Sequence, residues 1–116
     1  MNQEIKKRWT DALRSGHYEQ GKDSLRNAES NSFCCLGVLT DLYLKEQNYE
    51  WSSLLCDSPR LPSSVVEWAE LKNANPGFRD ESFTEGTNYP YHYLAALNDD
   101  ENMPFKEIAD LIEKYL

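Results

Sequence analysis

The sequence predicts a single α+β domain spanning residues 1–116, in which four or five helices surround a small sheet of short strands. Three observations predict this fold. Apolar residues recur at helical spacing near both ends and in the middle of the chain, and short, partly alternating stretches lie between these segments. The length of 116 residues allows one core but not two independent ones. With 40% hydrophobic residues, we expect the domain to fold alone.

The first helix is expected over about residues 2–15. Ile5, Trp9 and Leu13 return at helical spacing, and Gly16 follows as a natural C-terminal cap. Residues 24–35 (SLRNAESNSFCC) then form two short stretches around a polar centre, a pattern that is typical of a weak hairpin rather than a helix.

A central, mostly buried helix is expected from Cys35 to about residue 47, because apolar residues continue there at intervals of three and four. Cys35 shares the apolar stripe with Leu39. Cys34 lies about 100° around the helix from Cys35, so it is the thiol expected to keep a route to solvent. Residues 49–56 (YEWSSLLC) partly alternate and predict a third short strand.

The second half of the chain predicts a short helix at residues 62–71 and the clearest helix of all at residues 103–116, each with a proline near its start. Residues 91–99 (YHYLAALND) predict one or two further helical turns. The polar stretch at 72–90 is longer than a typical connection, and it is interpreted as a variable surface insertion in preference to a functional or mobile loop.

Charge and composition exclude several classes of function. The net charge of -8 opposes phosphate-driven binding to duplex nucleic acid, although residues 1–30 hold six basic side chains against five acidic ones. No apolar segment approaches the roughly 18 residues that a membrane span requires, and the first 16 residues are amphipathic, so we expect a cytoplasmic protein. An odd count of 3 cysteines suits reduced thiols in that compartment.

The stretch most suited to a ligand is residues 14–26 (RSGHYEQGKDSLR). It brings forked donors, an aromatic face and an amide together in Arg14, Tyr18, Gln20, Lys22 and Arg26. Such a set suits a phosphate or a nucleotide. The alternative is an ordinary helix cap and turn with solvated charges, and the stretch taken alone favours that alternative.

A cysteine-dependent hydrolase or transferase is a second hypothesis. Cys34 or Cys35 would be the nucleophile, His92 the base, and Asn98 or Asp99 the orienting group. No nucleophile motif surrounds the two thiols, and apolar neighbours predict burial, which raises a thiol pKa. Buried core is therefore the favoured interpretation of both cysteines.

Metal sites receive little support from the sequence. The candidate ligands show neither a C-x-x-C pair nor an H-x-x-x-H pair; they are Cys34, Cys35, Cys56, His17 and His92. Residues 98–102 (NDDEN) are interpreted as the polar turn between two helices rather than as a magnesium site or an acid–base pair. We expect no metal and no cofactor.

The whole chain resembles a family of small accessory proteins encoded in tailed-phage and prophage genomes. The landmarks are ALRSGHYEQG after Trp9, FCCLGVLTDLY, LPSSVVEWAEL, NANP and LAALNDDENMPFKEIADLIEKYL. The resemblance implies an accessory role in the bacterial host cytoplasm, outside the main structural parts of the virion. It brings no established reaction. Family members commonly have small apolar residues before LND and no histidine at the place of His92, so the resemblance does not support a pairing of cysteine with histidine.

The first hypothesis from these observations is that the chain is a non-enzymatic phage protein that counteracts a bacterial defence. Its partner would be a cyclic or other signalling nucleotide, which it sequesters, or a host defence protein. A homo-oligomer is one alternative for its assembly, because many small sponges are oligomers. A further alternative is an inhibitor of a defence nuclease in which the acidic surface of residues 41–116 mimics DNA.

Overall fold

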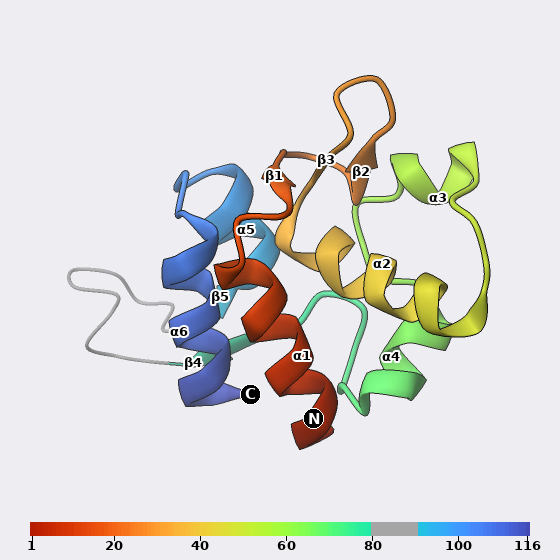
Figure 1. Ribbon diagram of the computed structural model, residues 1–116. Helices are drawn as coiled ribbons and strands as arrows, with labels where there is room; N and C mark the ends of the chain where they lie inside the picture. The colour runs from red at the N-terminus through yellow and green to blue at the C-terminus, as the bar shows by residue number, and fades with distance from the viewer. Residues whose placement is uncertain (80–90) are drawn as a thin grey trace.

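The computed structural model describes residues 1–79 and 91–116, and in it helices from the two ends of the chain pack against each other (Figure 1). α1 (Gln3–Arg14) is capped by Asn2, and α6 (Phe105–Tyr115) begins after Pro104. The two helices run in opposite directions, and the amino group of Met1 donates to the carbonyl of Leu116 at 3.3 Å. The sequence predictions for both helices are confirmed.

α2 (Cys35–Gln47) is the central helix, as the sequence predicts, and its first seven residues are all buried. The side chain of Cys34 caps it, because Sγ accepts a hydrogen bond from the amide of Gly37 at 3.4 Å. The indole of Trp9 donates to the carbonyl of Cys35 at 3.0 Å, which fixes α1 on the start of α2. Asn48 ends the helix in the left-handed conformation.

Gly37 allows α2 to lie directly against the chain at Leu25. A Cβ atom at position 37 would come within 1.7 Å of the carbonyl oxygen of Leu25. The glycine inside this helix is therefore required for close approach of two backbones and not for a turn. Leu25 itself is fully buried and lies one residue before the strand β2.

Three strands of two residues each form a small sheet in the order β1-β3-β2. β2 (Arg26–Asn27) and β3 (Ser32–Phe33) are antiparallel and confirm the predicted hairpin. β1 (Glu19–Gln20) pairs with β3 in parallel and was not expected from the sequence, because two polar residues carry no alternation. Phe33 thus lies between Gln20 and Arg26 in the register.

The prediction of a strand at residues 49–56 is wrong. The hydroxyl of Ser52 accepts a hydrogen bond from the amide of Leu55 at 3.1 Å and starts a short helix, α3 (Ser53–Asp57). Leu54, in the first turn of this helix, is 86% exposed. The helix expected at residues 62–71 is present as α4 (Ser63–Ala69).

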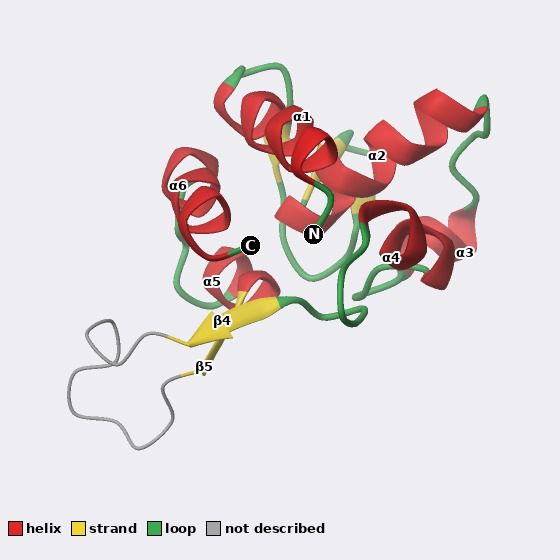
Figure 2. Cartoon of the chain, turned by 90° about the horizontal axis from the view of Figure 1, so that it is seen from below, coloured by secondary structure: helices red, strands yellow, loops and turns green. Residues whose placement is uncertain are grey.

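A second sheet joins β4 (Gly77–Arg79) to β5 (Tyr91–Tyr93) in antiparallel register, and Figure 2 shows it on one side of the helices. Residues 77–79 were expected to be surface loop and 91–93 to be helix, so both expectations are wrong there. The predicted helical turns begin only at α5 (Leu94–Asp99), because Tyr91 to Tyr93 pair with β4 instead. Residues 80–90 of the stretch interpreted as a surface insertion lie outside the described residues.

Within the described part of the chain, six helices and two small sheets make one α+β domain, in agreement with the predicted fold class. The Cα radius of gyration of 13.5 Å is close to the roughly 13 Å expected for a single domain of this length. None of the described helices is long and apolar enough to span a bilayer.

Candidate functional site

A surface groove of about 970 Å³ is formed by the described residues. It lies where the end of α1, the loop after α1, the three-stranded sheet and the second half of α2 meet. The lining is mixed in character, with rings, acids and bases: Asp11, Ala12, Ser15, Gly16, His17, Tyr18, Glu19, Arg26, Ser30, Asn31, Phe33, Asp41, Leu42, Lys45 and Trp51. Two residues that the sequence selected, Tyr18 and Arg26, are therefore brought together in one groove.

Asp41 anchors one wall of the groove. Its carboxylate accepts hydrogen bonds from the hydroxyl of Tyr18 at 2.5 Å and the indole of Trp51 at 2.9 Å, and it pairs with Lys45 at 2.9 Å. Burial by itself raises the pKa of Asp41, but the hydrogen bonds from these three partners outweigh burial and leave the pKa below its usual value. Asp41 is therefore a charged acceptor that holds three lining side chains in place.

Tyr18 is held in a single orientation by its surroundings. Burial, and then the hydrogen bond to Asp41, raise the pKa of the Tyr18 hydroxyl to about 12, so the group is a neutral donor at physiological pH. Its ring meets the ring of Phe33 edge to face, with centroids 5.0 Å apart. The ammonium group of Lys45 lies 5.4 Å from the centre of the Tyr18 ring.

Arg26 lies over the aromatic floor of the groove. Its guanidinium carbon is 5.9 Å from the ring centre of Phe33 and also 5.9 Å from that of Trp51. These two rings are 6.0 Å apart, so the cation contacts both. Its two hydrogen bonds go to uncharged atoms: Nε donates to Asn31 at 3.2 Å, and Nη1 donates to Sγ of Cys56 at 3.6 Å.

The positive charge of Arg26 is left without a carboxylate partner in the described part of the chain. The five ion pairs found there involve Lys7, Arg8, Arg14 and Lys45 as the cations. Arg26 is only partly buried, so its guanidinium can meet a ligand from solvent. A stacked, unpaired guanidinium in a groove is suited to an anion that also carries a flat ring.

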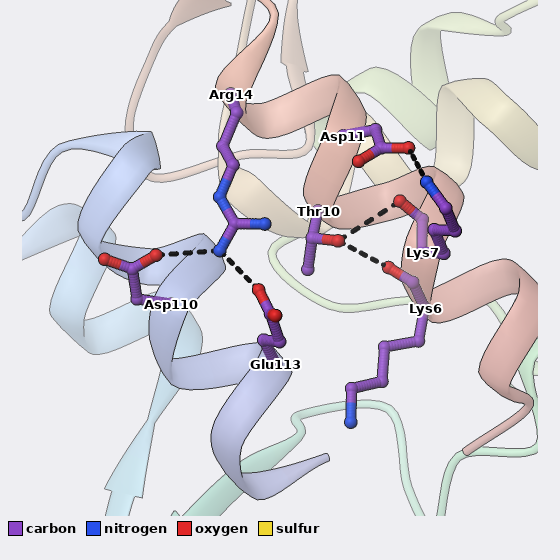
Figure 3. Close-up of polar contacts among 7 residues, drawn as sticks. All are labelled: Lys6, Lys7, Thr10, Asp11, Arg14, Asp110 and Glu113. Carbon is purple, nitrogen blue, oxygen red and sulfur yellow. Dashed lines mark hydrogen bonds and ion pairs between the residues drawn. The ribbon is translucent and has the colours of Figure 1, made fainter.

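Arg14, also predicted as a ligand residue, forms ion pairs with α6 and does not line the groove. Figure 3 shows its side chain reaching from α1 to α6, where Nη2 donates to Asp110 at 2.7 Å and to Glu113 at 2.6 Å. These hydrogen bonds raise the pKa of Arg14 further above its already high value. Its charge is thus matched by two carboxylates in packing the terminal helices together.

Gln20 and Lys22 are also turned away from the groove. The amide nitrogen of Gln20 donates to Asn98 and to the carbonyl of Met103, each at 2.8 Å, and its oxygen accepts from the amide of Phe105 at 3.2 Å. Lys22 donates to the side chain of Asn102. Both residues join β1 and the following turn to the segment between α5 and α6.

The residues proposed for cysteine catalysis lie in packed surroundings. Cys34 is only 2% exposed, which corrects the expectation that it keeps a route to solvent, and burial raises its pKa to about 11. Cys35 is fully buried, its pKa is raised well above the usual value by burial, and its thiol donates to the carbonyl of Leu94 at 3.6 Å. Neither thiol is set up to ionise near neutral pH.

His92 and Asn98 make structural contacts in different parts of the domain. The ring of His92 lies in β5 against Phe78, with centroids 5.4 Å apart. Asn98 is fully buried, and its amide donates to the carbonyl of Gly21 and to Asp99. Among residues 1–79 and 91–116, no group of three or more His, Cys, Asp or Glu side chains is placed to hold a metal ion.

Phe33, Asp41, Lys45 and Trp51 belong to the groove but were missed by the sequence analysis. The signal that could have found them is Asp41, a carboxylate inside the apolar run of a buried helix, which needs polar partners. Lys45 follows one helical turn later, at the spacing of an ion pair. Trp51 lies in the segment that was interpreted as a strand.

The model of one protein family matches residues 1–116, and its description is "Domain of unknown function (DUF8296)". The chain belongs to the DUF8296 family. No curated protein and no solved structure matches this DUF8296 chain.

Proposed function

We propose that this protein is a non-enzymatic binding protein that takes up a nucleotide in the groove formed around Tyr18, Arg26 and Trp51. The observation that carries the proposal is the guanidinium of Arg26, stacked over Phe33 and Trp51 and free of any carboxylate among the described residues. A phosphate group accepts two parallel hydrogen bonds from a guanidinium, and a base stacks on an aromatic ring or on the guanidinium plane.

The rest of the groove supports binding rather than turnover. Asp41 is occupied by three donors, and Tyr18 has a pKa raised to about 12 by burial and by Asp41, so neither group is suited to act as a base near neutral pH. The cysteine-dependent hypothesis is weaker, because burial raises the pKa of both Cys34 and Cys35. Fixed side chains around an open hollow suit capture of a preformed ligand.

The proposed biological role follows from the resemblance to phage accessory proteins. A small protein that binds a signalling nucleotide in the bacterial cytoplasm would lower its free concentration and so blunt a defence that the nucleotide activates. Sequestration needs affinity and abundance but no reaction. A host protein as the partner is the alternative, and it would leave the groove without affinity for nucleotides.

Isothermal titration of the pure protein with a panel of linear and cyclic nucleotides tests the proposal. We expect at least one member to bind, and Arg26→Gln to weaken that binding tenfold or more, because it removes the one Lys or Arg without an ion pair among the described residues of the groove lining. Arg60→Gln is the matched control, since Arg60 is an exposed arginine outside the groove lining. Absence of binding heat across the panel, or equal affinity of the Arg26 variant, would overturn it.

A further inference from the structure

The charges that line the groove are unequal, and this limits how many phosphates a ligand can carry. Three acidic residues are in its lining, Asp11, Glu19 and Asp41, against two basic ones, Arg26 and Lys45. The lining therefore has a formal charge of −1 (two minus three), within a chain whose net charge is -8. A ligand with high negative charge would approach a surface of its own sign.

Most of these charges are already paired. Lys45 lies 2.9 Å from the carboxylate of Asp41, and Asp11 lies 2.8 Å from Lys7, one turn earlier on α1. Among the described residues this leaves one lining cation, Arg26, and one lining carboxylate, Glu19, outside any ion pair. The groove thus offers an anion one unpaired guanidinium, with one unpaired acidic residue in the neighbouring edge strand.

The two unpaired groups are separated by the sheet. Glu19 is in β1 and Arg26 is in β2, on opposite sides of β3. Strands two positions apart in a sheet lie roughly 10 Å from each other. The register pairs Glu19 with Ser32 and Arg26 with Phe33, and successive residues of a strand face opposite ways, so the two side chains lie on opposite faces of the sheet. Glu19 therefore acts on a ligand at Arg26 through its charge and not through contact.

We infer that the groove selects nucleotides with a single phosphate group, as a monoester or a cyclic diester, over di- and triphosphates. The inference rests on the proposed function and adds the substrate class. One phosphate is matched by one guanidinium. Each further phosphate adds negative charge for which the described lining residues hold no second unpaired Lys or Arg, and Glu19 and the net charge of the protein repel it.

The test compares AMP, cyclic AMP and ATP, and the same three guanine compounds, by titration in magnesium-free buffer containing EDTA. We expect the better monophosphate of one base to bind at least tenfold more tightly than the triphosphate of that base. Glu19→Gln removes the unpaired carboxylate. It should lower the ratio of monophosphate to triphosphate affinity at least threefold by improving triphosphate binding. Because Glu19 is exposed in an edge strand, the variant should retain the fold, which circular dichroism checks.

The outcomes separate this inference from the proposed function. Triphosphates that bind as tightly as monophosphates, or more tightly, would overturn the selectivity and leave nucleotide binding in place. A difference between monophosphate and triphosphate that Glu19→Gln does not change would overturn the role of Glu19. If none of the six compounds binds at millimolar concentration, the selectivity is wrong; the proposed function is overturned as well only if the wider panel of nucleotides also gives no binding heat.

Discussion

The hydroxyl of Tyr18 donates a 2.5 Å hydrogen bond to the carboxylate of Asp41, and this contact joins the loop after α1 to the middle of α2. Removal of the hydroxyl in Tyr18→Phe leaves Asp41 with two donors in place of three. Because hydrogen bonds to charged groups stabilise more than neutral ones, we expect the free energy of unfolding to fall by about 1 to 2 kcal/mol. Urea denaturation measures this, with the exposed Tyr49→Phe as a control that should change little. Equal losses in the two variants would contradict a special role for the contact.

The carboxylate of Asp41 also makes the free energy of unfolding depend on pH. The pKa of Asp41 in the folded protein lies below the ordinary value, since the hydrogen bonds it accepts outweigh the effect of burial. Its contribution is therefore complete above the unfolded pKa of about 3.9 and is lost as the pH falls through the lower folded pKa. Between about pH 5 and pH 3 we expect the parent protein to lose more unfolding free energy than Asp41→Asn does. Parallel pH profiles from urea denaturation would be inconsistent with this.

Two glycines should respond differently to substitution by alanine. At Gly37 the new Cβ would overlap the carbonyl oxygen of Leu25, so we expect a loss of at least about 3 kcal/mol or failure to fold. At Gly16 no atom lies within 4 Å of a Cβ, but φ is +79°, and the expected cost is about 1 kcal/mol for an alanine in the left-handed region. Thermal unfolding of both variants checks the order, and a Gly37 variant as stable as the Gly16 variant would refute the close packing of α2 on Leu25.

The three cysteine thiols should be protected from alkylation in the native protein. All three cysteines are buried, and burial raises the pKa of Cys34 and Cys35, so little thiolate is present at neutral pH. With iodoacetamide at pH 7 we expect no rapid labelling of the native chain and three adducts after denaturation in urea, read by intact mass. Rapid modification of Cys34 in the native protein would instead revive the cysteine-dependent hypothesis.

Much of the fold could be predicted from local pattern, because its main helices carry their own signals. α1 and α6 each have an apolar stripe at helical spacing and a capping residue or proline at the start. The strands β1, β4 and β5 were missed, since two or three residues are too few to show alternation and their pairing partners lie elsewhere in the chain. The strand expected at residues 49–56 failed because Ser52 caps a helix there.

The candidate site could be predicted only in part, for a related reason. Tyr18 and Arg26 reach the groove as the stretch 14–26 suggests, but Arg14 and Gln20 are drawn to partners 96 and 78 residues away in the sequence. A cluster of hydrogen-bond donors in the sequence does not show which of them donate to distant parts of the same chain in the folded protein. Asp41 and Trp51, which complete the groove, come from segments that carry no ligand motif of their own.

The most direct test of nucleotide binding in the groove is the mapping of amide and indole chemical shifts in the ¹⁵N-labelled protein during titration with AMP and cyclic AMP. We expect the largest chemical-shift changes at Tyr18, Arg26, Phe33 and the indole of Trp51, and no changes around the hollow between α1 and α6 near Lys6 and Arg14. Changes centred on that second hollow, or no changes at millimolar nucleotide, would show that the groove around Arg26 does not bind these nucleotides.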